Sequence, residues 1–182
     1  MSAFKLRKAV SELKAGRVIA YPTEAVYGLG CDPLNANAVL HLLHLKKRPL
    51  HKGLILIGAS LEQLQPYVEL DDELIAKITA RLHEPITWVV PTQAWVPNFL
   101  TGDHSSLAIR VTQHPLAKAL CEAYNGAIVS TSANVNTKPS AKKAWQLRKS
   151  FARHKFFVLH GAVGQLQRET AIYDAVTNQR LR

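Results

Sequence analysis

The sequence predicts a single α/β domain over residues 1–182, built on a mixed β-sheet with flanking helices. Its 182 residues are 47% apolar and 20% charged, the composition of a folded protein with one substantial core. Helical and strand-like hydrophobic patterns alternate along the whole chain. The run GLILIG at residues 53–58 is continuously apolar, as is typical of a strand buried on both faces of a sheet.

The first two predicted elements are a helix and a strand. Residues 4–15 carry apolar side chains at helical spacing, and Gly16 follows as a stop signal. Val18 to Tyr21 forms a short apolar strand, which ends at Pro22 because proline cannot continue a central ladder.

A helix, a buried strand and a second helix come next. The first of these helices spans Asn35 to Lys46, and the strand spans Gly53 to Gly58. The second helix covers residues 71–82 and begins with three acidic residues, which stabilise the positive end of a helix.

The same alternation continues in the second half of the chain. Ile86 to Val90 and Leu107 to Val111 are predicted strands, residues 114–124 a helix, and Ala127 to Ser130 a further strand. Cys121 falls on the apolar face of that helix, which predicts a core residue.

The last predicted helix is basic. It spans Ala141 to Arg153, and the strands Phe156 to Leu159 and Ile172 to Ala175 follow it. The apolar residues expected to anchor this helix are Ala144, Trp145 and Phe151. Helices between strands favour some parallel pairing, while the strand order is left open.

No segment has the pattern of a membrane span or a signal peptide. The longest apolar stretch, Leu54 to Leu61, is too short to cross a bilayer. Lysines and arginines interrupt residues 1–17 throughout. Cys31 and Cys121 are too few for a disulfide framework and show no metal-ligand spacing. We therefore expect a cytoplasmic protein.

The formal net charge of +10 is concentrated in one region. Residues 1–122 hold 13 basic and 11 acidic side chains, whereas residues 123–168 hold eight basic and no acidic ones. Such an excess suggests an anionic partner, such as RNA or a nucleotide, and is equally compatible with a role in solubility alone.

Four polar clusters follow strand ends or tight turns, where ligands collect in open α/β folds. The first is YPTEAVYGLG at residues 21–30, in which Thr23 offers a hydroxyl at a strand end. This segment is compatible with an ordinary strand-to-helix loop or with a binding site. The second is KKRP at residues 46–49, whose cations either stabilise the end of the preceding helix or bind phosphate.

The other two clusters also leave alternatives open. Arg110 lies among apolar residues of a strand, so it needs either an internal carboxylate or a substrate carboxylate or phosphate as its partner. The segment STSAN at residues 130–134 follows a strand, and its hydroxyls either cap the next helix or bind phosphate or ribose.

No nucleophile, general base or metal site emerges from the sequence. His41 and His44 lie three apart on a predicted helix without a third ligand, and we interpret them as surface or packing residues. Glu24 is the only acidic residue within a motif. These residues indicate a site that positions anions and leave its metal unknown.

The order and spacing of YPTEAVYGLG, KKRP with KGLILI, SLAIRV followed by HPL, and STSAN resemble the YrdC family of threonylcarbamoyl-AMP synthases in its short bacterial form. The resemblance covers roughly residues 5–176. It implies an open, twisted α/β sheet with a positively charged concave face.

The resemblance also implies an enzyme, a nucleotidyltransferase. It would condense L-threonine, bicarbonate and ATP, with Mg²⁺, into threonylcarbamoyl-adenylate and pyrophosphate. The product would serve the threonylcarbamoyladenosine modification of tRNA next to the anticodon. A partner transferase complex would then move the group to tRNA.

Matching positions assign the site residues that the resemblance implies. Threonine would contact Thr23, Arg110 and Thr131. ATP would contact Lys46, Arg48, Thr87, Ser132, Asn134, Ser140 and Thr170. No residue would form a covalent intermediate, and Lys46, Arg48 and Arg110 would position the anions electrostatically.

Three positions depart from the family pattern. His83-Glu84-Pro85 replaces Pro-Gly-Pro before the strand of Thr87, Asn136-Thr137 replaces Ser-Gly, and Thr170-Ala171 replaces Ser-Thr. Each change removes a glycine or a hydroxyl near the expected site. A reduced or altered activity therefore stays open.

A non-catalytic RNA-binding or ribosome-maturation module is the alternative function. It would use the basic segment 138–155, in which Trp145 and Phe151 lie among the cations, and direct RNA binding of this kind is salt-sensitive. The competing interpretation is a solvated helix face with both aromatics in the core. A domain of larger hydrogenase-maturation proteins is set aside, because the chain lacks their acylphosphatase and zinc-finger regions.

Overall fold

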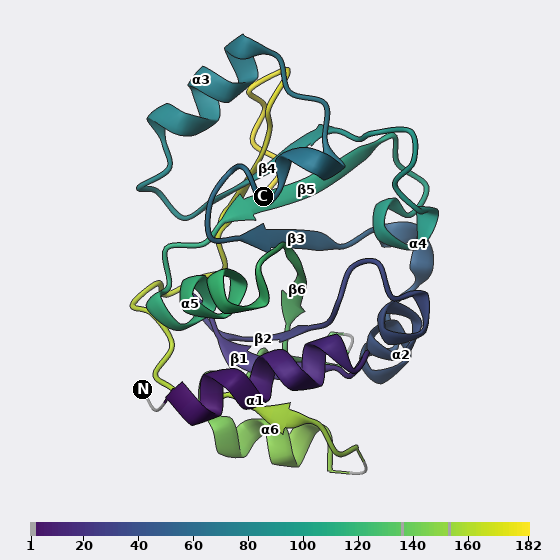
Figure 1. The fold of residues 1–182 in the computed structure, drawn as a ribbon, viewed down its shortest axis with the longest axis vertical. Helices are drawn as coiled ribbons and strands as arrows, with labels where there is room; N and C mark the ends of the chain where they lie inside the picture. Colours follow the sequence, from purple (N-terminus) through teal and green to yellow (C-terminus); the bar gives the residue numbers. More distant parts are fainter. Residues whose placement is uncertain (1–2, 136, 153) are drawn as a thin grey trace.

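The computed structural model describes residues 3–135, 137–152 and 154–182. Its strands are β1 (Ile19–Pro22), β2 (Tyr27–Gly30), β3 (Ile55–Gly58), β4 (Ile86–Pro91), β5 (Ser106–Val111), β6 (Ile128–Ser132), β7 (Phe157–Val158) and β8 (Ala171–Asp174). Its helices are α1 (Ala3–Lys14), α2 (Ala36–Lys46), α3 (Asp72–Ala80), α4 (Asn98–Thr101), α5 (Pro115–Tyr124) and α6 (Ala144–Ser150), with the short 3-10 turns η1 (Leu50–Lys52) and η2 (Gln65–Tyr67). The alternation of helix and strand confirms the predicted α/β class (Figure 1).

The eight strands form one sheet in the order β7-β1-β2-β6-β3-β5-β4-β8, which the sequence had left open. Strand β1 is parallel to β7, β3 to β5, and β4 to β8, and the remaining neighbours are antiparallel. The sheet is therefore mixed, as predicted. Strand β6 joins its two parts, because it pairs with β2 on one side and with β3 on the other.

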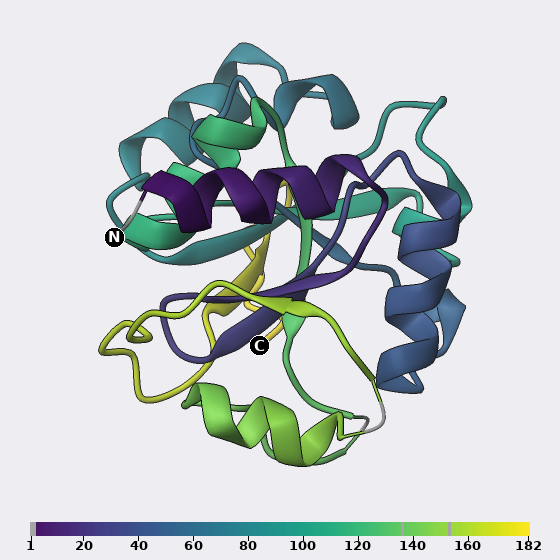
Figure 2. The same ribbon diagram turned by 60° about the horizontal axis from the view of Figure 1, so that its bottom comes forward.

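Alternate residues of the strands face two hydrophobic clusters. Ile57 and Ile128 pack with α1 and α5 on one face, while their neighbours Leu56 and Val129 pack with α2, α3 and α6. This two-residue alternation is what a sheet covered on both faces requires. Figure 2 shows α1 lying across the sheet, with α2 and α6 apart from it.

The segment from residue 21 to residue 30 folds as a β-hairpin, so of the two alternatives left open for it, the strand-to-helix loop is wrong. Strand β1 ends at Pro22 as predicted, and the chain turns at residues 23–26 and returns as β2. Gly30 has no room for a side chain, because the backbone oxygen of Val129 and the ring of Tyr21 lie against it. The glycines of strand β2 thus allow this strand to pack closely against its neighbours in the sheet.

The first residues of the STSAN segment belong to strand β6, whereas the sequence predicted that the segment follows a strand. Strand β6 continues through Thr131 and Ser132, which lie opposite Leu29 and Gly28 of β2. Their hydroxyl side chains therefore stand on the sheet, and none of them caps the next helix, whose N-cap is Lys143. This outcome excludes the capping alternative for these residues.

The basic helix α6 is shorter than predicted and does not bury Trp145. Leu147 and Phe151 are buried, whereas the Trp145 side chain is 60% exposed. Two residues of an α-helix turn it by about 200°, so Trp145 and Leu147 point in opposite directions. The expectation that Trp145 anchors this helix is wrong, and Arg153 lies outside the described residues.

Several side chains take the positions that the sequence predicts. Cys31 and Cys121 are both buried and free. His41 and His44 are exposed on α2. Within the described residues, no helix is long and apolar enough to cross a bilayer.

Candidate active site

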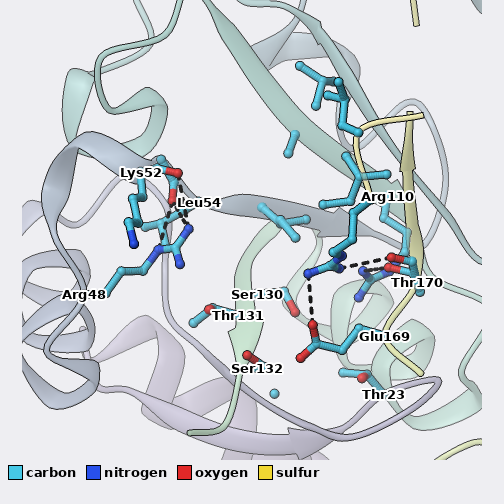
Figure 3. A pocket seen from close by; sticks show the side chains of 18 of the residues that line it. Thr23, Arg48, Lys52, Leu54, Arg110, Ser130, Thr131, Ser132, Glu169 and Thr170 are labelled. Carbon is cyan, nitrogen blue, oxygen red and sulfur yellow. Dashed lines mark hydrogen bonds and ion pairs between the residues drawn. The ribbon is translucent and has the colours of Figure 1, made fainter. Parts of the chain in front are cut away.

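A cavity of about 490 Å³ lies over the sheet (Figure 3). Strands β2, β3, β4, β5, β6 and β8 contribute to its walls, together with the turn after β1 and the C-terminal segment. Its polar and charged lining consists of Thr23, Glu24, Arg48, Lys52, Thr101, His104, Ser106, Arg110, Ser130, Thr131, Ser132, Glu169, Thr170, Asp174 and Arg182. Residues far apart in the sequence thus meet at one hollow of the sheet.

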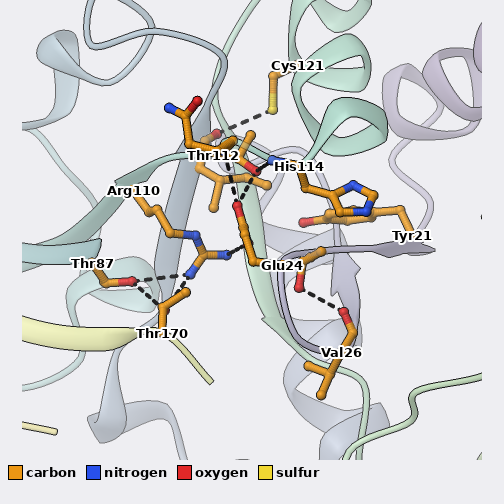
Figure 4. A network of polar contacts seen from close by, with 12 residues as sticks. Tyr21, Glu24, Val26, Thr87, Arg110, Thr112, His114, Cys121 and Thr170 are labelled. Atoms are coloured by element: carbon orange, nitrogen blue, oxygen red, sulfur yellow. Dashed lines mark hydrogen bonds and ion pairs between the residues drawn. The ribbon is translucent and has the colours of Figure 1, made fainter. Parts of the chain in front are cut away.

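Four buried residues form what we call the inner cluster: Glu24, Thr87, Arg110 and Thr170 (Figure 4). Arg110 Nη1 donates hydrogen bonds to Thr87 Oγ1 at 3.2 Å and to Thr170 Oγ1 at 3.1 Å. Arg110 Nη2 lies 3.4 Å from Glu24 Oε2. Of the two partners that the sequence left open for Arg110, the structure contains the internal carboxylate.

The turn between β1 and β2 places Glu24 at this cluster. Glu24 Oε1 accepts hydrogen bonds from Thr112 Oγ1 at 2.6 Å and from the backbone N–H of Gln113 at 3.2 Å. Burial alone would raise the pKa of the carboxyl, but the charge of Arg110 and the Thr112 hydrogen bond outweigh it and hold the pKa of Glu24 below its ordinary value. The inner cluster therefore contains an ion pair that is shielded from water.

Four of the charged lining residues that keep contact with solvent form what we call the outer cluster: Arg48, Lys52, Glu169 and Arg182. Arg48 Nη2 donates to the backbone oxygens of Lys52 at 3.2 Å and Gly53 at 2.9 Å. Arg182 Nη1 pairs with Glu169 Oε2 at 2.9 Å. Burial and, secondarily, the charge of Arg182 lower the pKa of Arg48. The cations of this cluster repel one another, and an anionic ligand would relieve that repulsion.

Lys46 is buried beside the cavity at the end of α2. Its Nζ donates to the backbone oxygens of Ser132 and Asn134, the latter at 2.9 Å, and to Asn134 Oδ1 at 3.0 Å. Burial is the main cause that lowers the pKa of Lys46 to about 8, and the charge of Arg48 adds to it. The three hydrogen bonds of Lys46 thus hold the chain at and after the end of β6.

A chain of hydrogen bonds extends this contact to the cavity wall. Ser132 Oγ donates to Asn134 Oδ1 at 2.8 Å, and Asn134 Nδ2 donates to the Lys138 carbonyl at 2.7 Å. Ser140 Oγ donates to Glu169 Oε1 at 3.1 Å. The STSAN segment is therefore held in place by polar contacts on both of its sides.

All the site residues expected from the sequence lie at the cavity or against residues that line it. Those that line it are Thr23, Arg48, Arg110, Thr131, Ser132 and Thr170. Those one contact away are Lys46, Thr87, Asn134 and Ser140. The geometry brings the ten residues together, while their roles stay predictions.

Several further lining residues received no role from the sequence, and four of them carry charge at the clusters described above. Glu24 is the acid that the sequence analysis noted within a motif, and Lys52 opens the KGLILI run, but neither was given a ligand. Glu169 and Arg182 carry no sequence signal, because their meeting depends on the fold of the C-terminal segment. A pairing rule for buried charges could have linked Glu24 to Arg110.

The departures from the family pattern have separate structural outcomes. Glu84 pairs with Arg81, whose guanidinium lies 5.6 Å from the centre of the Trp88 ring, and residues 83–85 do not line the cavity. Thr137 has a φ of 64°, the left-handed conformation that favours glycine. Asn136 lies outside the described residues.

The part of the chain that the structure describes contains no group of three His, Cys, Asp or Glu side chains that could hold a metal ion. The carboxylates that line the cavity are Glu24, Glu169 and Asp174. Glu24 is turned to Arg110 and Glu169 to Arg182. Two of the three carboxylates thus already face a cation of the protein.

The chain is similar to proteins of one family along nearly its whole length. The Sua5/YciO/YrdC family model, described as telomere recombination, matches residues 11–182. The threonylcarbamoyl-AMP synthase of Methylococcus capsulatus is 48% identical over 183 residues, which are 100% of this chain and 98% of that protein. The threonylcarbamoyl-AMP synthase of Coxiella burnetii is 44% identical over 178 residues, 97% of this chain and 96% of that protein.

Solved structures agree with this similarity. Sua5 of P. abyssi superposes with a TM-score of 0.90 at 31% identity, covering 96% of this chain and 54% of that one. A second P. abyssi Sua5 structure, complexed with L-threonine, gives a TM-score of 0.87 at 31% identity, with 96% and 52% covered. The chain thus spans about half the length of these two structures. E. coli YciO, at 24% identity and a TM-score of 0.78, supports the fold alone.

Proposed function

The chain belongs to the Sua5/YciO/YrdC family, and on that premise we propose that it is a threonylcarbamoyl-AMP synthase, a nucleotidyltransferase. The observation that carries this function is the similarity, at 44% to 48% identity over nearly the full length, to curated proteins of that name. Relatives that are enzymes along their whole length do not favour the alternative of a non-catalytic RNA-binding module.

The reaction that follows from this function joins threonine, bicarbonate and ATP. The threonine amine takes up the carbon of bicarbonate as a carbamate, water is released, and a carbamate oxygen attacks the α-phosphate of ATP. Pyrophosphate leaves, and threonylcarbamoyl-adenylate remains. Both reacting partners are anions, so placed cations lower the barrier without a covalent enzyme intermediate.

The inner end of the cavity is the proposed threonine site. Arg110 binds the carboxylate, and Thr23 and Thr131 line the same cavity. The similarity to the P. abyssi Sua5 structure complexed with L-threonine supports this placement. Thr87 and Thr170 hold the Arg110 guanidinium before the substrate arrives.

The proposed ATP site extends to the outer cluster. The residues assigned to it are Lys46, Arg48, Thr87, Ser132, Asn134, Ser140 and Thr170. Arg48 lines the cavity and is free to donate hydrogen bonds to phosphate oxygens in exchange for its backbone partners. Thr87 is covered by Arg110, so its direct contact with the nucleotide requires that side chain to shift. The positive character of this concave face is part of the proposal.

Mg²⁺ enters this proposal with the nucleotide, as the metal complex of the triphosphate. Magnesium keeps several waters and uses phosphate oxygens as ligands, so it does not require a dedicated protein cage. When bound, it would neutralise the triphosphate and stabilise the departing pyrophosphate.

Pyrophosphate release tests the function directly. Purified protein with ATP, Mg²⁺, L-threonine and bicarbonate is expected to release pyrophosphate and to form threonylcarbamoyl-adenylate, detectable by mass spectrometry. Omission of any one substrate is expected to abolish both signals. Pyrophosphate release without threonine would contradict the assignment.

We also propose that a cytoplasmic transferase complex acting on tRNA takes over the product. We further propose that α6 contacts RNA directly. The exposed Trp145 lies on α6, where the exposed Lys142 and Lys143 precede the helix and the exposed Lys149 lies in its last turn. Aromatic and cationic side chains together bind single-stranded RNA. Neutralising the three lysines is expected to weaken tRNA binding in a gel-shift assay and to leave pyrophosphate release intact. Unchanged binding would contradict this contact.

A further inference from the structure

A second hollow of about 420 Å³ lies away from the active-site cavity, at the end of the sheet that β7 forms. Lys5 of α1, one face of α6 and the residues on both sides of β7 line this hollow, which we name the edge groove. In Figure 2, β7 lies between α1 and α6. The edge groove and the active-site cavity have no lining residue in common, so an occupant of one does not occupy the other.

The floor of the edge groove is an open strand edge. Strand β7 pairs with β1, with Val158 opposite Ala20, and in the part of the chain that the structure describes no strand pairs with its other side. The N–H of Leu159 donates to the oxygen of Ala20 at 2.8 Å. Because successive residues of a strand direct their backbone groups to opposite sides, the N–H and C=O of Val158 point away from β1. An extended chain can therefore add to β7 as a further strand.

One face of α6 forms the wall of the edge groove beside this strand edge. The lining residues on it have the spacing i, i+3, i+4 and i+7 and are Ala144, Leu147, Arg148 and Phe151. Leu147 and Phe151 are buried, whereas Arg148 is exposed. An open strand edge beside apolar pockets is how many proteins bind an extended peptide, because the edge pairs with its backbone and the pockets take alternate side chains.

The charged residues that line the edge groove are basic. Lys5, Arg148 and Lys155 are exposed, and none of them is in an ion pair with a carboxylate that the structure describes. His154 and His160 also line the groove, and its described lining contains no Asp or Glu. The sequence holds no acidic residue from position 123 to position 168. A negatively charged occupant would therefore relieve the repulsion between these cations.

We propose that the edge groove binds an extended acidic segment of a partner protein, which pairs with β7 as an added strand. The backbone of the segment pairs with Val158, and its apolar side chains face Leu147 and Phe151. Its carboxylates lie beside Arg148 and Lys155. This inference goes beyond the proposed function and does not depend on it.

The aromatic residues of the edge groove favour a peptide over RNA. Base stacking needs an aromatic ring whose face is exposed. Phe151 is 2% exposed, and Phe156 packs edge-on against it with ring centres 5.5 Å apart. The exposed aromatic residue of α6 is Trp145, which points away from Leu147 and the groove. The two faces of α6 therefore suit different partners.

The cations of the edge groove also disfavour a second copy of this chain as the occupant. Pairing of two β7 edges would bring Arg148 and Lys155 of both copies together, and like charges repel. Lysines beside an open strand edge are a common protection against pairing with other edges. An acidic strand is attracted by the same side chains, so the charge selects the partner.

A peptide selection on the full chain tests the occupant. A phage library of random peptides is panned on the immobilised wild-type protein, and the enriched peptides are synthesised and titrated by fluorescence anisotropy. We expect these peptides to alternate acidic and apolar residues, because alternate side chains of an added strand face the same way. Enrichment of basic or uncharged peptides, or of no peptide, would overturn the proposal.

N-methylation of the enriched peptide tests strand addition without any change to the protein. Each peptide carries one methyl group on one backbone amide, which removes that hydrogen-bond donor. Alternate amides of an added strand face β7, so we expect an affinity loss of about five- to tenfold at every second position and little change between them. Binding should also slow the amide hydrogen exchange of Val158. A uniform effect of methylation, or unchanged exchange at Val158, would overturn the added strand.

Charge reversal in the groove tests the acidic character of the partner. The double variant Arg148→Glu with Lys155→Glu changes exposed side chains, so we expect unchanged thermal unfolding and a loss of peptide affinity of about tenfold or more. The matched control is Lys142→Glu with Lys149→Glu, at exposed positions outside the groove lining. Equal losses in the two variants would assign the effect to net charge and overturn the groove as the site.

Three further measurements separate this proposal from its alternatives. Oligouridylate in excess should not displace the peptide, and its displacement of the peptide would assign the groove to RNA. Sedimentation should show a free protein whose β7 edge is not used by a second copy, and a dimer that the Arg148 and Lys155 reversal dissociates would overturn the proposal. Pyrophosphate release should be the same with and without the peptide, so a failure of the proposed function is read separately.

Discussion

The inner and outer clusters meet at one cavity but hold their charges in different ways. In the inner cluster, Arg110 is bound by the side chains of Glu24, Thr87 and Thr170, and all four residues are buried. In the outer cluster, Arg48 is bound by backbone oxygens and keeps contact with solvent. A small ligand at the inner cluster therefore meets charged side chains that are buried and held in place. A larger polyanion at the outer cluster meets charged side chains that can change conformation.

The difference also separates binding from folding. Removing one member of a buried ion pair leaves an uncompensated charge and costs about 3–5 kcal/mol. Exposed ion pairs such as Glu169 with Arg182 contribute about 0–1 kcal/mol. Substitutions in the inner cluster should therefore affect stability and activity together, and those in the outer cluster activity alone.

Arg110→Ala is expected to give the largest effect. It leaves the Glu24 carboxylate buried without its cation, so we expect about 3–5 kcal/mol lower stability and no measurable threonine binding. Urea unfolding and calorimetry measure the two quantities. A stable variant that still binds threonine would remove the distinction between the clusters.

Arg48→Ala is expected to affect the nucleotide and spare the fold. Loss of a charged phosphate contact should raise the KM for ATP about 10- to 100-fold at saturating threonine, with a stability change of about 1 kcal/mol or less. Steady-state pyrophosphate release and thermal unfolding check both. A raised KM for threonine with an unchanged KM for ATP would exchange the roles of the two clusters.

Thr87→Val sharpens the comparison within the inner cluster. The substitution keeps the shape and removes the hydroxyl that accepts from Arg110 Nη1 at 3.2 Å. We expect a stability loss of about 1 kcal/mol and weaker threonine binding, because the guanidinium is less firmly held. Thr79→Val, at an exposed position of α3, is the control and should change neither.

The pH dependence of stability is expected to show the smallest difference. The pKa of Glu24 is lowered in the folded state from its ordinary value of 4.5, so the unfolded chain binds the proton more readily. This contribution is present above that value and is lost as the pH falls below it. Urea unfolding between about pH 6 and pH 3 should show a steeper decline for the wild type than for Glu24→Gln. Parallel declines would contradict a shielded, ionised Glu24.

Most elements could be predicted because their hydrophobic period is local. Strand β3, for example, was recognised from the apolar run GLILIG alone. Strand β2 was not, because the four residues YGLG contain two glycines and show no strand propensity. Its place depends on packing against Tyr21 and Val129, which the local sequence does not report.

The candidate site was predictable as a set of residues but not as a geometry. The motifs marked Arg110 and Arg48, yet they could not show that one is buried on Glu24 and the other faces the cavity. The sequence could not indicate the pairing of Glu169 with Arg182, because it depends on how the C-terminal segment packs beside β8. Which of these distant residues contact each other is determined by long-range strand pairing, and the periodicity of the sequence does not report it.

The strand order carries a consequence for how the protein folds. Strand β1 pairs with its neighbour β2 on one side but on the other with β7, where Ile19 lies opposite Phe157. Such non-local pairings slow folding, because the chain loses entropy in closing a long loop before the stabilising contacts form. The cavity draws on residues from Thr23 to Arg182, so it should be complete only after these pairings form. Ligands added during refolding should then raise the final yield of native protein and leave its rate of formation unchanged.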